Sequence, residues 1–117
     1  NPKYRNEVFI MTFKQITDSF NKRFYDLSSC LYDNQYKFNH FDPDSDSLDT
    51  RREYAAILCE SYRGLVDLTS EIDIFRRFAS KDSEKDSLFK LGCVIDDFCD
   101  KWFDFVADVH SMYHWDY

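Results

Sequence analysis

The chain has 117 residues and combines 12 Phe, 8 Tyr and 2 Trp with only 2 Gly and 2 Pro. A single domain of this length can bury a core without metals or disulfides, and so few turn-forming residues disfavour a β-sandwich. The net charge of −7 argues against nucleic acid and anionic membranes as partners, and the lack of a membrane-length apolar run or a signal-peptide pattern predicts a soluble, cytoplasmic protein.

The first predicted helix covers about residues 5–37. Residues 5–37 contain no Pro or Gly. Its apolar residues recur at steps of three and four, which places them on one side of an α-helix. They are Phe9, Phe13, Ile16, Phe20, Phe24, Leu27 and Leu31.

Residues 38–49 break this pattern, because they contain a proline and a cluster of Asn, Asp and Ser, which favour turns. Thr50 and Glu53 then fit a capping box at the start of a second helix, predicted for about residues 50–80. Its apolar stripe keeps its phase across Gly64, so we expect one helix; a break there is the alternative, because an interior Gly costs about 1 kcal/mol relative to Ala. The stripe consists of Tyr54, Leu58, Ser61, Leu65, Leu68, Ile72, Phe75 and Ala79.

A second polar connection, residues 80–87, precedes a third helix predicted for about residues 87–114, with Ser83 or Asp86 as its capping residue. Short connections require neighbouring helices to run antiparallel. The sequence therefore predicts an all-α, up-down-up bundle of three long helices with coiled-coil-like packing, in which residues 1–117 form one domain. The third stripe consists of Leu88, Leu91, Ile95, Phe98, Trp102, Phe105, Val109 and Met112.

The opposite side of the third helix is rich in aspartate. Like charges one turn apart cost a helix about 0.2–0.5 kcal/mol per pair, which favours a role for this row in binding a basic protein. A solvated face that serves solubility explains such a row at least as readily. Phe89 and Phe103 lie beside these carboxylates and resemble the aromatic anchors of a protein-binding patch, and the alternative is that a neighbouring helix or the C-terminal tail covers them. The five acids are Asp96, Asp97, Asp100, Asp104 and Asp108.

Residues 42–53 match part of an EF-hand calcium loop at its positions 1, 3, 5 and 12. Ser47 replaces the required Gly, Asp49 stands where an apolar residue belongs, and the capping box already accounts for the last ligand. We therefore expect no calcium site. The four candidate ligands are Asp42, Asp44, Asp46 and Glu53.

His110 and His114 are spaced by four residues, which puts both rings on one helix face, as a zinc site requires. In an up-down-up bundle the first and third helices end near each other, so His40 is a candidate third ligand. Such a histidine pair is also common by chance. The sequence predicts no cofactor.

The four cysteines have no CxxC spacing and favour free thiols. The chain also lacks a Gly-rich phosphate loop, a G-x-S-x-G motif and an H-E-x-x-H motif, so we do not expect an enzyme. The leading hypothesis is a non-catalytic module, of an inhibitor or immunity type, that presents the acidic and aromatic helix face to a basic protein. The alternative is a structural helical unit that acts by self-association, such as a homodimer, or within a longer assembly.

Overall fold

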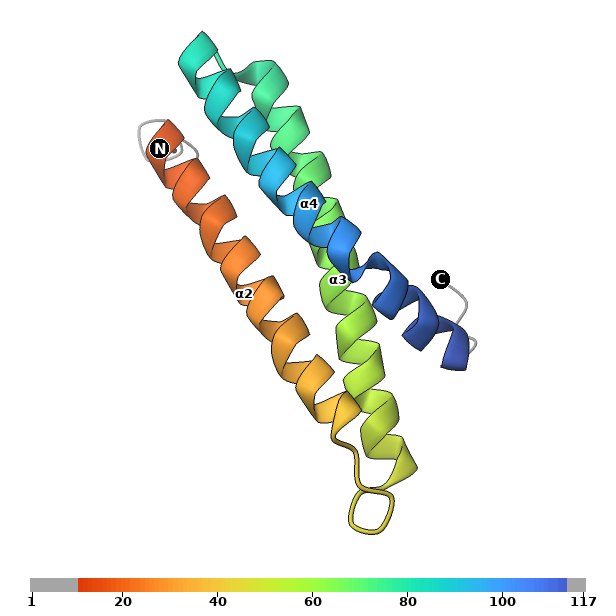
Figure 1. The fold of residues 1–117 in the computed structure, drawn as a ribbon. Coiled ribbons are helices and arrows are strands. Elements are labelled where there is room, and N and C mark those ends of the chain that lie inside the picture. The colour runs from red at the N-terminus through yellow and green to blue at the C-terminus, as the bar shows by residue number, and fades with distance from the viewer. Residues whose placement is uncertain (1–10, 114–117) are drawn as a thin grey trace, which may run out of the picture.

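The computed structural model describes residues 11–113, which form three long α-helices (Figure 1). α2 spans Phe13–Asn39, α3 spans Leu48–Phe78 and α4 spans Asp82–Tyr113. Successive helices run in opposite directions, and the described part of the chain contains no strand. The predicted all-α, up-down-up arrangement is confirmed.

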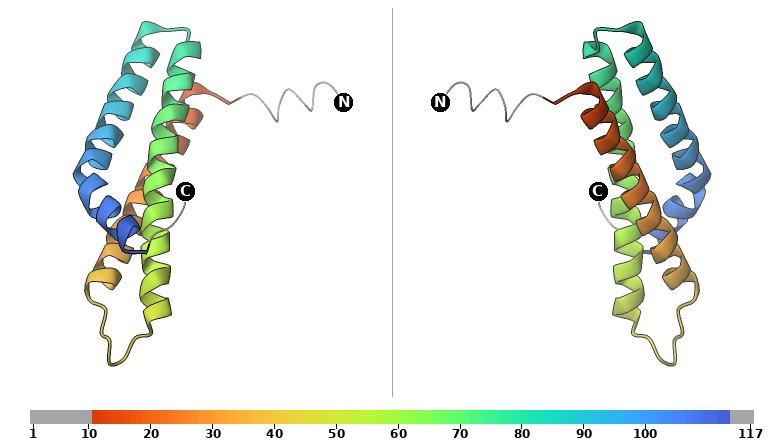
Figure 2. Two further views of the ribbon diagram at one scale, coloured as in Figure 1. Left: turned by 90° about the vertical axis from the view of Figure 1, so that its right-hand side faces the viewer. Right: turned by 90° about the vertical axis from the view of Figure 1, so that its left-hand side faces the viewer.

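α3 packs along both other helices, and the two connections lie at opposite ends of the bundle (Figure 2). The contact between α2 and α4 is made largely by aromatic side chains. Ring centroids are 5.5 Å apart for Phe24 and Phe98 and 5.1 Å apart for Tyr32 and Trp102. Large rings therefore fill the space between two helices whose backbones stay farther apart.

The apolar stripes form the core, as predicted, with two exceptions among the described residues. Met112 is 58% exposed and Phe75 is 43% exposed. A straight α-helix turns by about 20° per heptad relative to a 3.5-residue repeat, so the stripe on α4 has rotated out of the interface by the time it reaches Met112. For the same reason Cys99 and Val106, which lie beside the predicted stripe, are buried.

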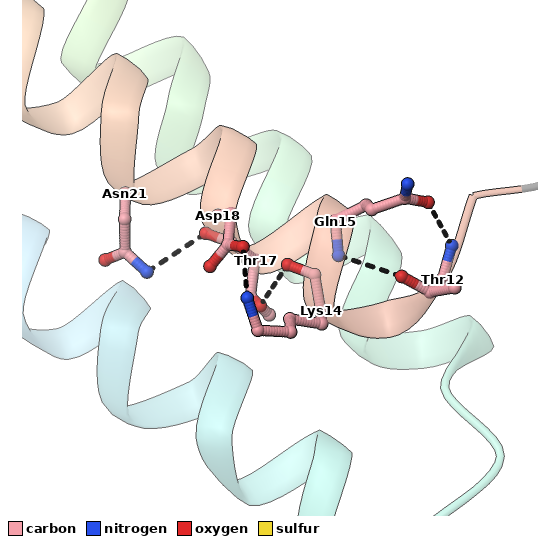
Figure 3. A network of polar contacts seen from close by, with 6 residues as sticks. All are labelled: Thr12, Lys14, Gln15, Thr17, Asp18 and Asn21. Atoms are coloured by element: carbon pink, nitrogen blue, oxygen red, sulfur yellow. Dashed lines mark hydrogen bonds and ion pairs between the residues drawn. The ribbon is translucent and has the colours of Figure 1, made fainter.

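Thr12 caps α2, which begins at Phe13, later than the sequence predicted (Figure 3). Its hydroxyl oxygen accepts a hydrogen bond from the Gln15 backbone N–H at 3.1 Å, and the Gln15 side chain accepts one from the Thr12 N–H at 2.9 Å. This reciprocal pair is a capping box, in which both residues satisfy backbone donors that the helix leaves unpaired. The remaining predicted part of this helix, including Phe9, lies outside the described residues.

Two sets of predicted capping residues were wrong. Ser47, not Thr50, caps α3, and its hydroxyl accepts the Thr50 N–H at 3.1 Å. α4 begins at Asp82, so Ser83 and Asp86 lie inside the helix. In α3, Ser47 can accept hydrogen bonds from the first free N–H groups as well as Thr50 can, and Ser47 comes earlier in the chain, so it serves as the cap.

α3 continues through Gly64 without a break, as expected from the phase of its stripe. α4 is also continuous, but its last turns, dark blue in Figure 1, are angled relative to the rest of the helix. None of the helices formed by residues 11–113 is long and apolar enough to cross a membrane.

Candidate functional site

The outer face of α4 carries the five acids singled out in the sequence, here called the acidic ridge: Asp96, Asp97, Asp100, Asp104 and Asp108. All five are exposed. They lie opposite Ile95, Trp102 and Val109, which face the core, because consecutive residues of a helix are 100° apart. The same periodicity that builds the bundle therefore displays the ridge.

None of the ion pairs among residues 11–113 includes an acid of the ridge. The acids of α2 provide the contrast, because each pairs with a lysine one turn away: Lys14 with Asp18, Lys22 with Asp26 and Lys37 with Asp33. The one ion pair within α4 joins Lys90 to Asp86, before the ridge begins. The ridge is therefore a row of carboxylates whose charge the described residues do not neutralise by ion pairing.

Phe89 and Phe103 are both exposed, as the sequence suggested, at 53% and 56%. They differ in their surroundings. The Arg76 guanidinium of α3 lies 5.4 Å from the centroid of the Phe89 ring and also donates a hydrogen bond to the Asp73 carboxylate at 2.7 Å. This bond is the main reason why the pKa of Asp73 is lowered. Arg76 therefore covers one face of Phe89. Phe89 also borders a cavity, which is lined by the charged residues Arg76, Arg77, Lys85 and Asp86, whereas the cavity next to Phe103 is mainly apolar.

The cavity next to Phe103 lies between α3 and the last turns of α4 and has a volume of about 360 Å³. It is lined by Cys59, Glu60, Tyr62, Arg63, Phe103, Val106, Ala107, His110 and Ser111. Most of this wall is apolar, and a volume of this size is in the range of ligand and anchor pockets. The cavity could not be predicted from the sequence, because its α3 wall comes from residues beside the apolar stripe.

Burial raises the pKa of two groups in this wall, Cys59 and Tyr62. Burial also raises the pKa of the neighbouring Cys99 thiol to about 11, and the carboxylates of Asp96 and Asp100 add to this effect. All four cysteines are free thiols. Because thiolates are the reactive form, burial makes Cys59 and Cys99 poor nucleophiles.

The calcium-loop candidates make hydrogen bonds within the connection between α2 and α3. The Asp42 carboxylate accepts hydrogen bonds from the Asp44 N–H at 2.9 Å and the Ser45 hydroxyl at 2.9 Å, and the bond from the Asp44 N–H is the main cause of its lowered pKa. Asp46 in turn accepts the Asp42 N–H at 3.0 Å. Glu53 is part of α3. The carboxylates of Asp42 and Asp46 therefore stabilise the turn between α2 and α3.

The histidine candidates are distributed over different surroundings. The His40 ring stacks on Tyr36, with 4.0 Å between the centroids, and its Nδ1 lies 2.8 Å from the Tyr36 carbonyl oxygen. His110 lines the cavity, and His114 lies outside the described residues. Within residues 11–113, no group of three or more His, Cys, Asp or Glu side chains is placed to hold a metal ion.

No protein-family model matches the sequence, and the comparisons with curated proteins and with solved structures find no similar protein. The acidic ridge, Phe89, Phe103 and the cavity are therefore the features from which a function can be inferred.

Proposed function

We propose that the chain is a non-catalytic binding module whose acidic ridge, with Phe89 and Phe103, contacts a basic surface of another protein. The observation that carries this proposal is the difference between α2 and α4: the acids of α2 are paired with lysines, and those of the ridge are not. Unpaired like charges destabilise a helix, so a partner that supplies positive charge would gain from binding here. Exposed aromatic rings beside the charges add the apolar contact that anchors such interfaces.

A specific form of this proposal is an inhibitor or immunity-type protein that covers a basic functional site of its target. A row of carboxylates along one helix can occupy a site that otherwise holds phosphates, because both present negative oxygens at regular spacing. The net charge of −7 also favours rapid association with a basic target.

The test is affinity capture from the native host with Asp100→Lys/Asp104→Lys as bait. We expect this variant to lose a basic partner that the wild type retains. The matched control is Asp18→Lys/Asp26→Lys, which changes the net charge equally but lies on α2 and not on α4. Helicity of both variants is checked by circular dichroism. Equal capture by the wild type and the ridge variant would remove the ridge from the interface.

An apolar patch at the other end of the bundle favours self-association as a second candidate function. Phe78, at the end of α3, is 81% exposed, and it borders a cavity of about 270 Å³ with Phe13 and Phe75. Exposed apolar patches of this kind are typical of protein–protein contacts. Light scattering over a concentration series tests this candidate: mass that rises with concentration in the wild type, but not in Phe78→Ser, supports a homodimer or larger assembly.

A further inference from the structure

The cavity between α3 and α4 and the acidic ridge are parts of one surface. Residues three or four apart are neighbours on a helix, so Asp100 lies beside Phe103, and Asp104 lies beside Ala107. Phe103 and Ala107 line the cavity and are exposed, so its rim opens to the surface. The cavity is therefore an apolar groove with carboxylates along its α4 side.

We propose that this groove binds the apolar stripe of a cationic amphipathic helix from a partner protein. The inference rests on the proposed function and adds to it the kind of structure that the ridge would recognise. Amphipathic helices bind grooves between helices through apolar residues at positions i, i+3 or i+4, and i+7. The α4 lining runs from Phe103 to Ser111, about 12 Å at 1.5 Å per residue, which matches two turns of such a helix.

The charges around the groove determine the composition of the partner helix. Lysine or arginine on the flank next to α4 would face Asp100 and Asp104. Arg63, on the α3 side, is exposed and belongs to none of the ion pairs among residues 11–113. Glu60 lies one turn before Arg63 on the same wall, so an acidic partner residue that faces Arg63 and a basic one that faces Glu60 would fix the direction in which the helix lies.

A second copy of this chain fits the groove poorly. Each copy carries a net charge of −7, and the polar face of its α4 is itself acidic. Two acidic ridges repel each other when they are brought together. A cationic helix instead neutralises the ridge while its apolar side chains enter the groove. Charge complementarity therefore selects a basic partner helix over self-association at this site.

The probe is a synthetic 18-residue helical peptide with leucines at i, i+4 and i+7 spacing and lysines elsewhere. A peptide with glutamate in place of lysine, and a lysine–leucine peptide with scrambled order, are compared with it by calorimetric titration. We expect the ordered cationic peptide to bind and the glutamate peptide not to bind. The scrambled peptide should bind at least about tenfold more weakly, because its leucines do not form a stripe.

Ala107→Trp fills the groove without changing a charge, and Val94→Trp places the same side chain elsewhere on the exposed surface of α4. We expect Ala107→Trp to weaken binding of the ordered cationic peptide at least about tenfold and Val94→Trp to leave it unchanged. Both variants should keep the helicity of the wild type, because both positions are exposed.

The outcomes separate this proposal from the proposed function. If Ala107→Trp binds as tightly as the wild type while Asp100→Asn/Asp104→Asn binds more weakly, the groove is not the site and the ridge still is. If neither variant weakens binding, both proposals are wrong. Weaker binding by both variants, with Val94→Trp unaffected, supports the groove.

Discussion

A Cβ atom on Gly64 would lie 3.0 Å from Cδ2 of Leu27, so the missing side chain lets α2 approach α3 at this point. Gly92 of α4 is different, because a Cβ atom there would meet Cγ2 of Ile72 at 3.8 Å, an ordinary van der Waals distance. Packing therefore disfavours a side chain at Gly64 more than at Gly92, although both glycines lie in helix interiors.

Gly92→Ala should stabilise the protein by about 1 kcal/mol, because alanine is the better helix former and fits the space. Gly64→Ala should gain less, since the Leu27 side chain must shift to accept the methyl group. Urea denaturation measures both, with equal m-values as the sign that the unfolding transition is unchanged. A larger gain at Gly64 than at Gly92 would contradict this account of the packing.

Trp102→Ala should destabilise the protein by about 3–5 kcal/mol, the usual cost of removing a large aromatic side chain from a core. The Trp102 ring contacts Tyr32 on α2 and Phe98 on α4, so its loss opens the space between these helices. Phe103→Ala removes the neighbouring, exposed ring and should cost less than about 1 kcal/mol. Similar losses in the two variants, measured by chemical denaturation, would contradict the aromatic contact between α2 and α4.

Asp104→Lys should raise the free energy of unfolding by about 0.5–1 kcal/mol at low salt. The change replaces repulsion from Asp100 and Asp108, each one turn away, with attraction, and this gain is reduced by new repulsion from Lys101 three residues before. The gain should shrink in high salt, because these charges are exposed and screened. Asp18→Lys, which breaks the ion pair with Lys14, should give no gain. A ridge variant that is more stable but no longer binds would separate folding from function.

Cysteine labelling should follow burial. At about pH 8, Ellman's reagent should modify the exposed Cys93 rapidly, and Cys59 and Cys99 only after unfolding. The Cys93→Ser variant supplies the control, because it should lose the rapid phase alone. Cys30 is half-buried and can react in folded Cys93→Ser. Rapid modification of a second thiol in this variant would show that Cys59 or Cys99 is accessible.

Stability should fall as the pH rises from 9.0, the ordinary pKa of the thiol, to about 11, the raised pKa of Cys99 in the folded protein. In this range the unfolded chain releases the Cys99 proton and the folded protein retains it, so alkali favours unfolding. The raised pKa values of Cys59 and Tyr62 act in the same direction. Cys99→Ala should show a shallower decline in thermal melts over this range, and an unchanged slope would contradict the assignment to Cys99.

The three helices and their buried sides could be predicted because the apolar spacing of each segment is regular over many turns. The position of Met112 could not, since it depends on the slow rotation of the stripe around α4. Helix starts were also less certain in the sequence. Ser47 and Thr50 are both suitable caps, and only the structure shows that Ser47 accepts the N–H of Thr50.

The exposed ridge and its two phenylalanines followed from helix periodicity alone, although their role in binding stays a prediction. The groove could not be derived in this way, because it depends on how α3 and the angled end of α4 are placed against each other. One feature of the sequence hinted at the groove: Val106 is an apolar residue that lies between the apolar stripe and the acidic ridge of α4. No pattern in the sequence pointed to Arg63 or Glu60 on the opposite wall.

The central place of α3 also bears on how quickly the protein folds. Its partners are the helices directly before and after it in the chain, so most native contacts form between segments joined by short connections. Closing such short loops loses little chain entropy, and domains built in this way reach their native state within microseconds to milliseconds. In a nascent chain, α2 and α3 can therefore pair before α4 has left the ribosome.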